Sequence, residues 1–203
     1  MNRLFKWGIA VAVVMLLCIL SYIVTDIKTA LWFHTVNIGW SNDLFNIITD
    51  FGESQWYLVT GVVLFVVFRK TNQSRAQSGL FLSSSVALSG VSADIFKYIA
   101  GRARPTLYFS EQLYGFNFFH YEYEWTSFPS GHSATAFSVA IVLTTLYPRW
   151  RLLFLFGGAL IAFSRIFLTQ HYISDVIAGS FLGIASSMLL YNFYFKTKLD
   201  VSE

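Results

Sequence analysis

The composition of this chain excludes an ordinary soluble domain. Of its 203 residues, 55% are hydrophobic and only 12% are charged, whereas a soluble domain carries about 25% charged residues. We therefore expect an integral membrane protein that forms a single domain over residues 1–203, with no separate soluble part and no nucleic-acid partner.

Six apolar segments along the chain are candidates to cross a bilayer, which takes about 20 residues per helix. Their approximate bounds are 7–25, 56–68, 79–98, 132–147, 151–168 and 173–195. The second and fourth are short, so we expect their ends to extend into neighbouring residues. The first resembles a signal peptide, but it is long and lacks a small-x-small cleavage site, so we expect it to be retained. The predicted fold class is all-α, an integral membrane six-helix bundle with interfacial helices or loops on its outer face.

Basic residues predict how these spans are oriented, because Lys and Arg flanking membrane helices collect on the cytoplasmic side. Every second connection is basic, and so are both ends of the chain. The basic residues on this side are Arg3, Lys6, Arg69, Lys70, Arg75, Arg149, Arg151, Lys196 and Lys198. Both termini are therefore predicted to lie in the cytoplasm. The other ends of the spans would face the periplasm or the cell exterior.

Two long connections lie on the predicted outer side, and both are rich in aromatic residues. Residues 26–55 would either lie in the lipid headgroup region or cover the end of the bundle. Residues 106–128 contain ten aromatic residues. A connection this long beside a reactive site is often a lid or a binding loop, and a cap resting on the membrane is the alternative. The sequence leaves both questions open.

Three separated motifs place polar and charged residues at the outer ends of the spans. They are KxxxxxxRP at residues 97–105, PSGH at residues 129–132 and SRxxxxxHxxxD at residues 164–175. Ionisable side chains at membrane depth are costly and usually serve a function. Because all three motifs fall on the same predicted face, we expect them to form one site.

Three cations in these motifs, Lys97, Arg104 and Arg165, are suited to surround one phosphate. A guanidinium group can bind two phosphate oxygens, and lysine adds a point charge. Together they would neutralise the charge on the oxygens of a transferring phosphoryl group. With three fixed cations, and with no cluster of metal ligands in the sequence, we expect neither a metal ion nor another cofactor.

The PSGH motif is typical of a helix start that binds an anion. The backbone N–H groups of Ser130, Gly131 and His132 would be free at a helix N-terminus and available to phosphate oxygens. Gly131 would allow close approach of the ligand, and the Ser130 hydroxyl would add a donor. Pro129 would occupy the first helical turn, where its missing N–H costs nothing.

The third motif combines a histidine and a carboxylate, His171 and Asp175, four residues apart. In a helix these two side chains share a face. The carboxylate would accept a hydrogen bond from one ring nitrogen and fix the tautomer whose other nitrogen attacks phosphorus. His132 would protonate the leaving group and later serve as base for the water that hydrolyses the phosphohistidine.

In order and spacing, the three motifs resemble those of the type 2 phosphatidic acid phosphatase family, which includes lipid phosphatases and vanadium-dependent haloperoxidases. The resemblance covers well over a third of the chain. The small size and the topology resemble those of bacterial members, which implies a location in the bacterial cytoplasmic (inner) membrane. The resemblance also implies His171 as nucleophile, His132 as acid and Asp175 as the residue that orients His171. The phosphate-binding residues that it implies are Lys97, Arg104, Ser130, Gly131 and Arg165.

These features predict a membrane lipid phosphatase that acts at the outer membrane surface through a phosphohistidine. Its partners would be the bilayer and a lipid phosphate: undecaprenyl pyrophosphate, phosphatidylglycerol phosphate, phosphatidic acid or lipid A. A phosphotransferase that passes the group to another lipid is one alternative, and a non-catalytic lipid-binding or transport protein is another. A haloperoxidase is disfavoured, because those enzymes are soluble.

Some polar residues near the motifs receive no catalytic role, namely His34, His120, Asp94 and Arg102. Of these, Asp94 could pair with a nearby cation or line the site. Gly179 and Gly183 have the spacing of a close helix contact. We expect that contact within the bundle, so the chain is predicted to be a monomer or a weak homodimer.

Overall fold

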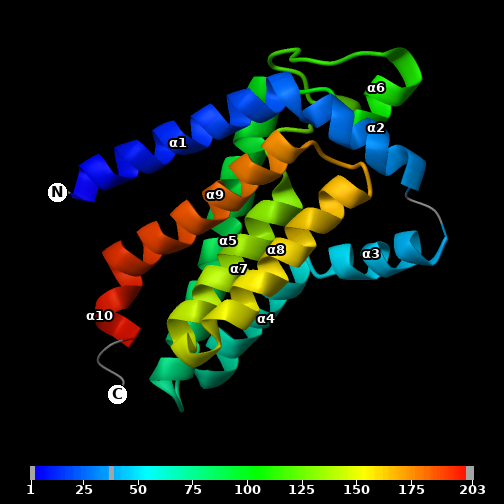
Figure 1. The fold of residues 1–203 in the computed structure, drawn as a ribbon. Helices are drawn as coiled ribbons and strands as arrows, with labels where there is room; N and C mark the ends of the chain where they lie inside the picture. Colours follow the sequence, from blue (N-terminus) through cyan, green and yellow to red (C-terminus); the bar gives the residue numbers. More distant parts are fainter. Residues whose placement is uncertain (1–2, 37–38, 200–203) are drawn as a thin grey trace.

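The computed structural model describes residues 3–36 and 39–199, and most of this part of the chain is helical (Figure 1). Its first half contains α1 (Arg3–Val24), α2 (Asp26–Val36), α3 (Trp40–Asp50), α4 (Ser54–Phe68) and α5 (Gln73–Ala100). Its second half contains α6 (Pro105–Glu111), η1 (Tyr123–Trp125), α7 (Gly131–Leu146), η2 (Pro148–Trp150), α8 (Arg151–Phe167), α9 (Ile173–Leu190), η3 (Tyr191–Phe195) and α10 (Lys196–Leu199).

Each of the six predicted apolar segments is helical in the structure. Five stretches are both long and apolar enough to cross a bilayer: Leu4–Val24, Trp40–Phe68, Gln73–Ala100, Pro148–Phe167 and Ile173–Leu199. The second of these includes α3 as well as α4. The helix α7 is also apolar but has 16 residues, a length of about 24 Å. The chain is therefore an all-helical membrane protein with several apolar helices.

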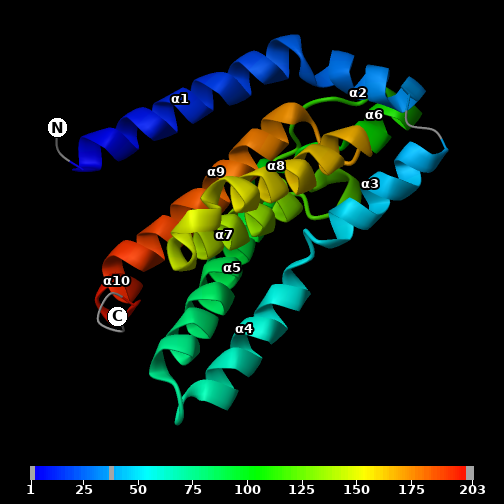
Figure 2. The same cartoon turned by 60° about the horizontal axis from the view of Figure 1, so that its bottom comes forward.

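The long helices form a bundle around α7 (Figures 1 and 2). The longest helix, α5, packs on α4, α7 and α9, and α7 lies between α5, α8 and α9. In contrast, α1 contacts the bundle mainly along α9. The short helices α2, α3 and α6 gather at the end of the bundle where α5 ends and where α7 and α9 begin. This arrangement brings the ends of the three motifs to one end of the molecule.

Close contact between α7 and α9 depends on two glycines. A Cβ atom added at Gly179 would lie 2.3 Å from the carbonyl oxygen of Ser130, and one added at Gly183 would lie 2.2 Å from that of Ala134. Both distances are far shorter than a van der Waals contact, so a larger residue would push the helices apart. The predicted contact of this glycine pair within the bundle is confirmed. Gly179 also holds the backbone of the PSGH motif against α9.

We expect Gly179→Ala to destabilise the protein by about 1–3 kcal/mol, because the added methyl group overpacks the α7–α9 contact. Its turnover should fall as well, since Ser130 must shift. Gly157→Ala is the matched control, because a Cβ atom there meets nothing within 4 Å. Thermal unfolding of both variants in detergent measures the difference. Equal melting temperatures for the two variants would refute this account of the contact.

The connection over residues 26–55 is mainly helical and covers the end of the bundle. Phe33 of α2 and Phe45 of α3 both pack against Phe163 and Phe167 of α8. The Phe45 and Phe167 rings are stacked, with centroids 4.1 Å apart. Trp40, by contrast, is 77% exposed. The structure thus supports the covering role, and it leaves a large apolar side chain on the outer surface of α3.

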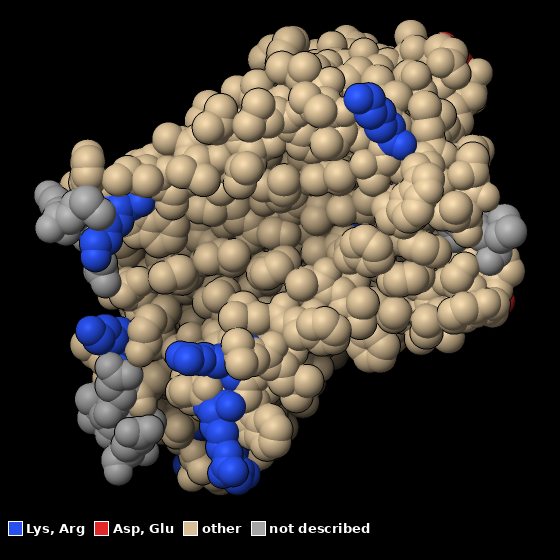
Figure 3. Space-filling model, in the orientation of Figure 1, with Lys and Arg blue, Asp and Glu red and all other residues tan. Residues whose placement is uncertain are grey.

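Lys and Arg side chains gather at the end of the molecule where α1 begins, α4 joins α5 and the chain reaches α10 (Figure 3). Lys6 lies in α1, Arg69 and Lys70 lie in the turn after α4, and Lys196 and Lys198 lie in α10. The motif residues lie at the other end of the bundle. The basic residues named here therefore lie together at one end of the bundle, away from the motif residues.

Candidate active site

His171 is buried in the turn between α8 and α9, with 3% of its surface exposed. Two backbone hydrogen bonds to the Arg165 carbonyl, from Gln170 (3.0 Å) and His171 (3.1 Å), fix the path of this turn. The His171 Nδ1 atom lies 2.8 Å from the carbonyl oxygen of Ser127. A carbonyl can only accept a hydrogen bond, so Nδ1 is the donor. This assigns the tautomer in which Nε2 carries the free lone pair.

The electrostatic surroundings of His171 keep its ring neutral. Burial, followed by the charges of Arg104, Arg165 and Lys97, holds the pKa of His171 well below its ordinary value. A neutral imidazole is the form that can act as a nucleophile. The same three cations that suit a phosphate therefore also keep the lone pair on Nε2 available near neutral pH.

Arg104 lies next to that lone pair. Its Nη1 atom is 3.5 Å from His171 Nε2. Backbone carbonyls hold the guanidinium: Nε donates to Tyr123 (2.9 Å), Nη1 to Gln170 (3.2 Å) and Nη2 to Thr126 (3.2 Å). The ring of Tyr123 lies 4.2 Å from the guanidinium carbon. The end of the 106–128 connection is therefore a clamp for Arg104, a role that neither of the two sequence-based interpretations included.

A polar cavity of about 230 Å³ brings Lys97, Gly131 and His132 together. Gly131 lies close to the ammonium group, because a Cβ atom added to it would lie 3.2 Å from Lys97 Nζ. Asp94, one turn before Lys97, accepts a 3.1 Å hydrogen bond from the ammonium group. The pairing with a nearby cation that the sequence suggested for Asp94 is confirmed, and Asp94 also lines this cavity. His132 is further enclosed by Gly52, where an added Cβ atom would lie 2.9 Å from the imidazole ring.

Arg165 approaches from the last turn of α8 and is 8% exposed. Its Nη1 atom donates to the Thr49 hydroxyl of α3 at 2.7 Å. Its Nε atom is buried and has no hydrogen-bond partner within residues 3–36 and 39–199. A buried donor without a partner is costly, and a bound anion would satisfy it.

The helix α7 begins at Gly131, with Ser130 as its N-cap. The Ser130 hydroxyl is buried and lies 3.0 Å from that of Ser133. The expectation that the backbone N–H of Ser130 is free is wrong, since it donates to the carbonyl of Asp175 at 3.0 Å. Pro129 is also not in the first helical turn, because it precedes the N-cap. The motif therefore ties the start of α7 to α9.

Asp175 is connected to His171 through Ser127. Its Oδ2 atom is 3.6 Å from His171 Nδ1, beyond hydrogen-bond distance. The same carboxylate accepts from the Ser127 hydroxyl at 2.6 Å and from the Tyr172 N–H at 2.9 Å. Asp175 thus fixes Ser127, whose carbonyl accepts the hydrogen bond from the imidazole. The direct hydrogen bond that the four-residue spacing predicted is absent from the structure.

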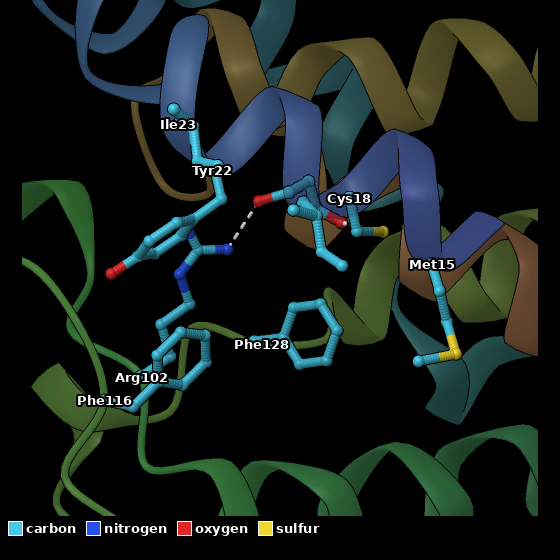
Figure 4. A pocket seen from close by; sticks show the side chains of 9 residues that line it. Met15, Cys18, Tyr22, Ile23, Arg102, Phe116 and Phe128 are labelled. Atoms are coloured by element: carbon cyan, nitrogen blue, oxygen red, sulfur yellow. Dashed lines mark hydrogen bonds between the residues drawn. The ribbon is translucent and has the colours of Figure 1, made fainter. Parts of the chain in front are cut away.

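Arg102, which the sequence left without a role, is the centre of a buried ionic network. Figure 4 shows its guanidinium group beside the ring of Tyr22, with one of its hydrogen bonds. Arg102 is 1% exposed. Its Nη2 atom donates to Asp26 Oδ2 at 2.7 Å, and its Nη1 atom donates to Ser174 Oγ at 2.6 Å and to Asp175 Oδ1. Burial acts to lower the pKa of Arg102, but Asp175 and Asp26 together raise it. The guanidinium is therefore permanently charged, and it neutralises two buried carboxylates.

Asp26 connects this network to the first helices. It is buried at the start of α2 and accepts hydrogen bonds from Ser21 Oγ (2.7 Å) and from the backbone N–H of Ser174 (3.1 Å). The rings of Tyr22 and Tyr172 lie 5.1 and 4.7 Å from the Arg102 guanidinium carbon. The sequence contained two indications of this network. Asp26 is an acidic residue directly after the first apolar segment, and Arg102 is an arginine inside a motif that had no assigned role.

Other ionisable side chains have structural partners away from the site. His34 stacks on Phe109 with ring centroids 4.1 Å apart. His120 lies 3.4 Å from Glu122 and 3.2 Å from the side chain of Asn117. Over the described ranges, no three His, Cys, Asp or Glu side chains gather in a way that could hold a metal ion.

The fold and the three motifs at one end of the bundle together indicate the class of protein. Residues 78–199 match the profile of the PAP2 superfamily, and the chain belongs to that superfamily. The lipid A 1-phosphatases of Rhizobium johnstonii and Rhizobium etli are 34% and 33% identical to it, over 70% and 72% of this chain. The matches span 64% and 68% of those two relatives. An undecaprenyl-diphosphatase of Sulfolobus acidocaldarius is 27% identical, over 84% of this chain and 86% of its own.

Two solved structures share the fold. The crystal structure of Aquifex aeolicus LpxE covers 83% of this chain and 95% of its own, with a TM-score of 0.61 and 19% identity. A PAP2-type phosphatidylglycerolphosphate phosphatase from Bacillus subtilis covers 91% and 96%, with a TM-score of 0.58 and 22% identity. At these identities, the two structures show a shared arrangement of helices and nothing about function.

Proposed function

We propose that this protein is an integral membrane lipid phosphatase that removes phosphate from a lipid headgroup through a phosphohistidine on His171. The observation that carries the proposal is the geometry of this residue. Its Nδ1 atom donates to the Ser127 carbonyl, and its unprotonated Nε2 atom faces Arg104, whose Nη1 atom lies 3.5 Å away. An oriented nucleophile among three cations is what a covalent phosphoryl transfer requires.

In the first step His171 Nε2 attacks phosphorus, the N–P bond forms and the bond to the leaving oxygen breaks. His132 supplies the proton to that oxygen, and Lys97, Arg104 and Arg165 neutralise the remaining phosphate oxygens. In the second step water attacks phosphorus, His132 takes its proton, and the P–N bond breaks to release phosphate. His132 is therefore the acid in the first step and the base in the second.

The substrate is proposed from the names of the relatives. Two are called lipid A 1-phosphatase and a third undecaprenyl-diphosphatase, so we place lipid A first, ahead of undecaprenyl pyrophosphate, phosphatidylglycerol phosphate and phosphatidic acid. Phosphate release from each lipid by the purified protein ranks them. A phosphotransferase would use the same phosphohistidine, and chromatography of labelled acceptor lipids separates transfer from hydrolysis.

Turnover should persist in excess EDTA, because Lys97, Arg104 and Arg165 provide the charge that a metal would otherwise supply. Vanadate should inhibit, since it adopts the five-coordinate geometry of the transition state and has His171 as a ligand. Phosphate release with EDTA, with vanadate and with neither measures both effects. Complete loss of activity in EDTA that added Mg²⁺ restores would rule out this assignment.

We further propose six membrane spans (α1, α4, α5, α7, α8 and α9), both termini in the cytoplasm, and the active site on the opposite face. The basic residues at one end of the bundle support this orientation. In a Cys18→Ala background, cysteine at Ser110 of α6 should react with a membrane-impermeant maleimide on intact cells. Cysteine at Thr71, in the turn between α4 and α5, should react only after permeabilisation. The reverse labelling pattern would put catalysis in the cytoplasm.

A further inference from the structure

Two cavities are lined by residues of α4, α5 and α7. The first is the polar cavity at Lys97 and His132, which also contains Glu53, Gln55 and Asp94. The second has a volume of about 660 Å³ and a largely apolar lining that includes Trp56, Leu64, Leu82, Val139 and Leu143. The two share all three helices, and the turn before α4 contributes residues to both. They are therefore consecutive compartments along one side of α7.

The register of α7 shows how they follow one another. His132 and Thr135 line the polar cavity, and Val139 and Leu143 line the apolar one. Residues at positions 0, 3, 7 and 11 form one stripe along a helix. From His132 to Leu143 this stripe extends about 16 Å along the helix axis. The same order holds on α4, where Trp56, Thr60 and Leu64 continue below the polar residues at its start.

Apolar space at this place is a consequence of how α4 packs. A Cβ atom added at Gly61 would lie 2.6 Å from the carbonyl oxygen of Gly79, so α4 touches α5 closely. By contrast, α4 makes little contact with α7, and Figure 2 shows the two helices apart. Helices that touch only slightly at membrane depth leave room for hydrocarbon, since water is absent there.

We propose that the apolar cavity binds the hydrocarbon chain of the substrate lipid directly below its phosphate. This rests on the proposed phosphatase function. A lipid phosphate is polar at one end and apolar beyond it, and the two compartments present the same order along one stripe of α7. The occupant is the substrate's own chain because the apolar cavity lies on the same stripe of α7 as the cavity of Lys97 and His132, where the phosphate is proposed to bind.

A second apolar groove, of about 390 Å³, lies between α1 and the connections that carry Arg102, Phe116 and Phe128, with Ser174 of α9 at its edge (Figure 4). It is lined by Met15, Ile19 and Phe128 and ends at Arg102, whose two Nη atoms are already bound to carboxylates and hydroxyls. No residue assigned to the phosphate site lines it. This groove is therefore the rival location for the chain and the comparison in the test.

Thr60→Trp fills the cavity from α4, and Val62→Trp is its control on the opposite face of the same helix, where the side chain is 52% exposed. With dipalmitoyl phosphatidic acid, Thr60→Trp should lower kcat/KM by about tenfold or more, as expected when several methylene groups lose their contacts. With dihexanoyl phosphatidic acid it should change little. Val62→Trp and Ile19→Trp should change neither. Equal loss on both substrates, or a chain-length effect in Ile19→Trp instead, would overturn the proposal.

A binding measurement makes the inference independent of turnover. Phosphatidic acid with a photoactivatable diazirine in its chain, bound to the protein in nanodiscs, should crosslink to Leu64, Val139 or Leu143. Crosslinks confined to Met15 or Ile19 would contradict it. If the wild type crosslinks as expected but releases no phosphate from any lipid, the phosphatase function fails and the chain site stands. If phosphate is released without these crosslinks, the chain site alone fails.

Discussion

Replacing His171 by asparagine should abolish phosphate release while the protein still folds. The asparagine amide can donate to the Ser127 carbonyl in place of Nδ1, which lies 2.8 Å from it, but it offers no nucleophile at the position of Nε2. Removing a catalytic nucleophile costs on the order of 10⁶-fold in kcat. The measurement is phosphate release by the purified variant, with size-exclusion chromatography and thermal unfolding as checks on folding.

His132→Ala provides the comparison for this variant. Loss of a general acid typically lowers the rate by about 10²–10⁴-fold. His132→Ala should therefore keep measurable activity, whereas His171→Asn should have none. The informative result is which of the two variants releases phosphate faster. Activity near the wild-type level in a folded His171→Asn variant would remove covalent catalysis at this residue.

Replacing Arg102 by methionine should be the second most damaging change. It leaves Asp26 and Asp175 buried without their shared cation, and breaking a buried ion pair costs about 3–5 kcal/mol. Turnover should fall as well, because Asp175 fixes Ser127 and thereby His171. Thermal unfolding in detergent and kcat measure the two effects. Arg75→Met is the control, since Arg75 is exposed at the start of α5.

A double variant separates charge from packing. Arg102→Met combined with Asp26→Asn removes one of the two uncompensated carboxylates and should recover part of the lost stability. Its kcat should stay low, because Asp175 still lacks its partner. An Arg102→Met variant with the melting temperature and kcat of the wild type would show that the network has neither a structural nor a positioning role.

The sequence predicted those parts of the site that depend on helices. Apolar runs determine where helices lie in a membrane, and alternating basic connections determine which ends share a face. Lys97 near the end of α5 and His132 at the start of α7 therefore meet, although 35 positions separate them in the printed numbering. The same logic brought Arg165 and His171 to that end of the bundle.

The remaining features depend on backbone that has no periodic pattern. The spacing argument for Asp175 assumed a helix over His171, but α9 begins at Ile173, and Asp175 instead caps its N-terminus by accepting from Tyr172. The clamp on Arg104 consists of carbonyls in an irregular connection, and any residue type can supply a carbonyl. The Asp26–Arg102 pair joins positions 76 residues apart, so neither local spacing nor propensity indicates it.

Direct trapping of the phosphorylated residue is the most decisive measurement. Purified protein would be mixed with a ³²P-labelled lipid phosphate, quenched at alkaline pH, where phosphohistidine is stable, digested and analysed by mass spectrometry. We predict label on the peptide that contains His171, lost on acid treatment and absent from His171→Asn. Continued phosphate release with no labelled peptide, or label on another residue, would contradict catalysis through His171.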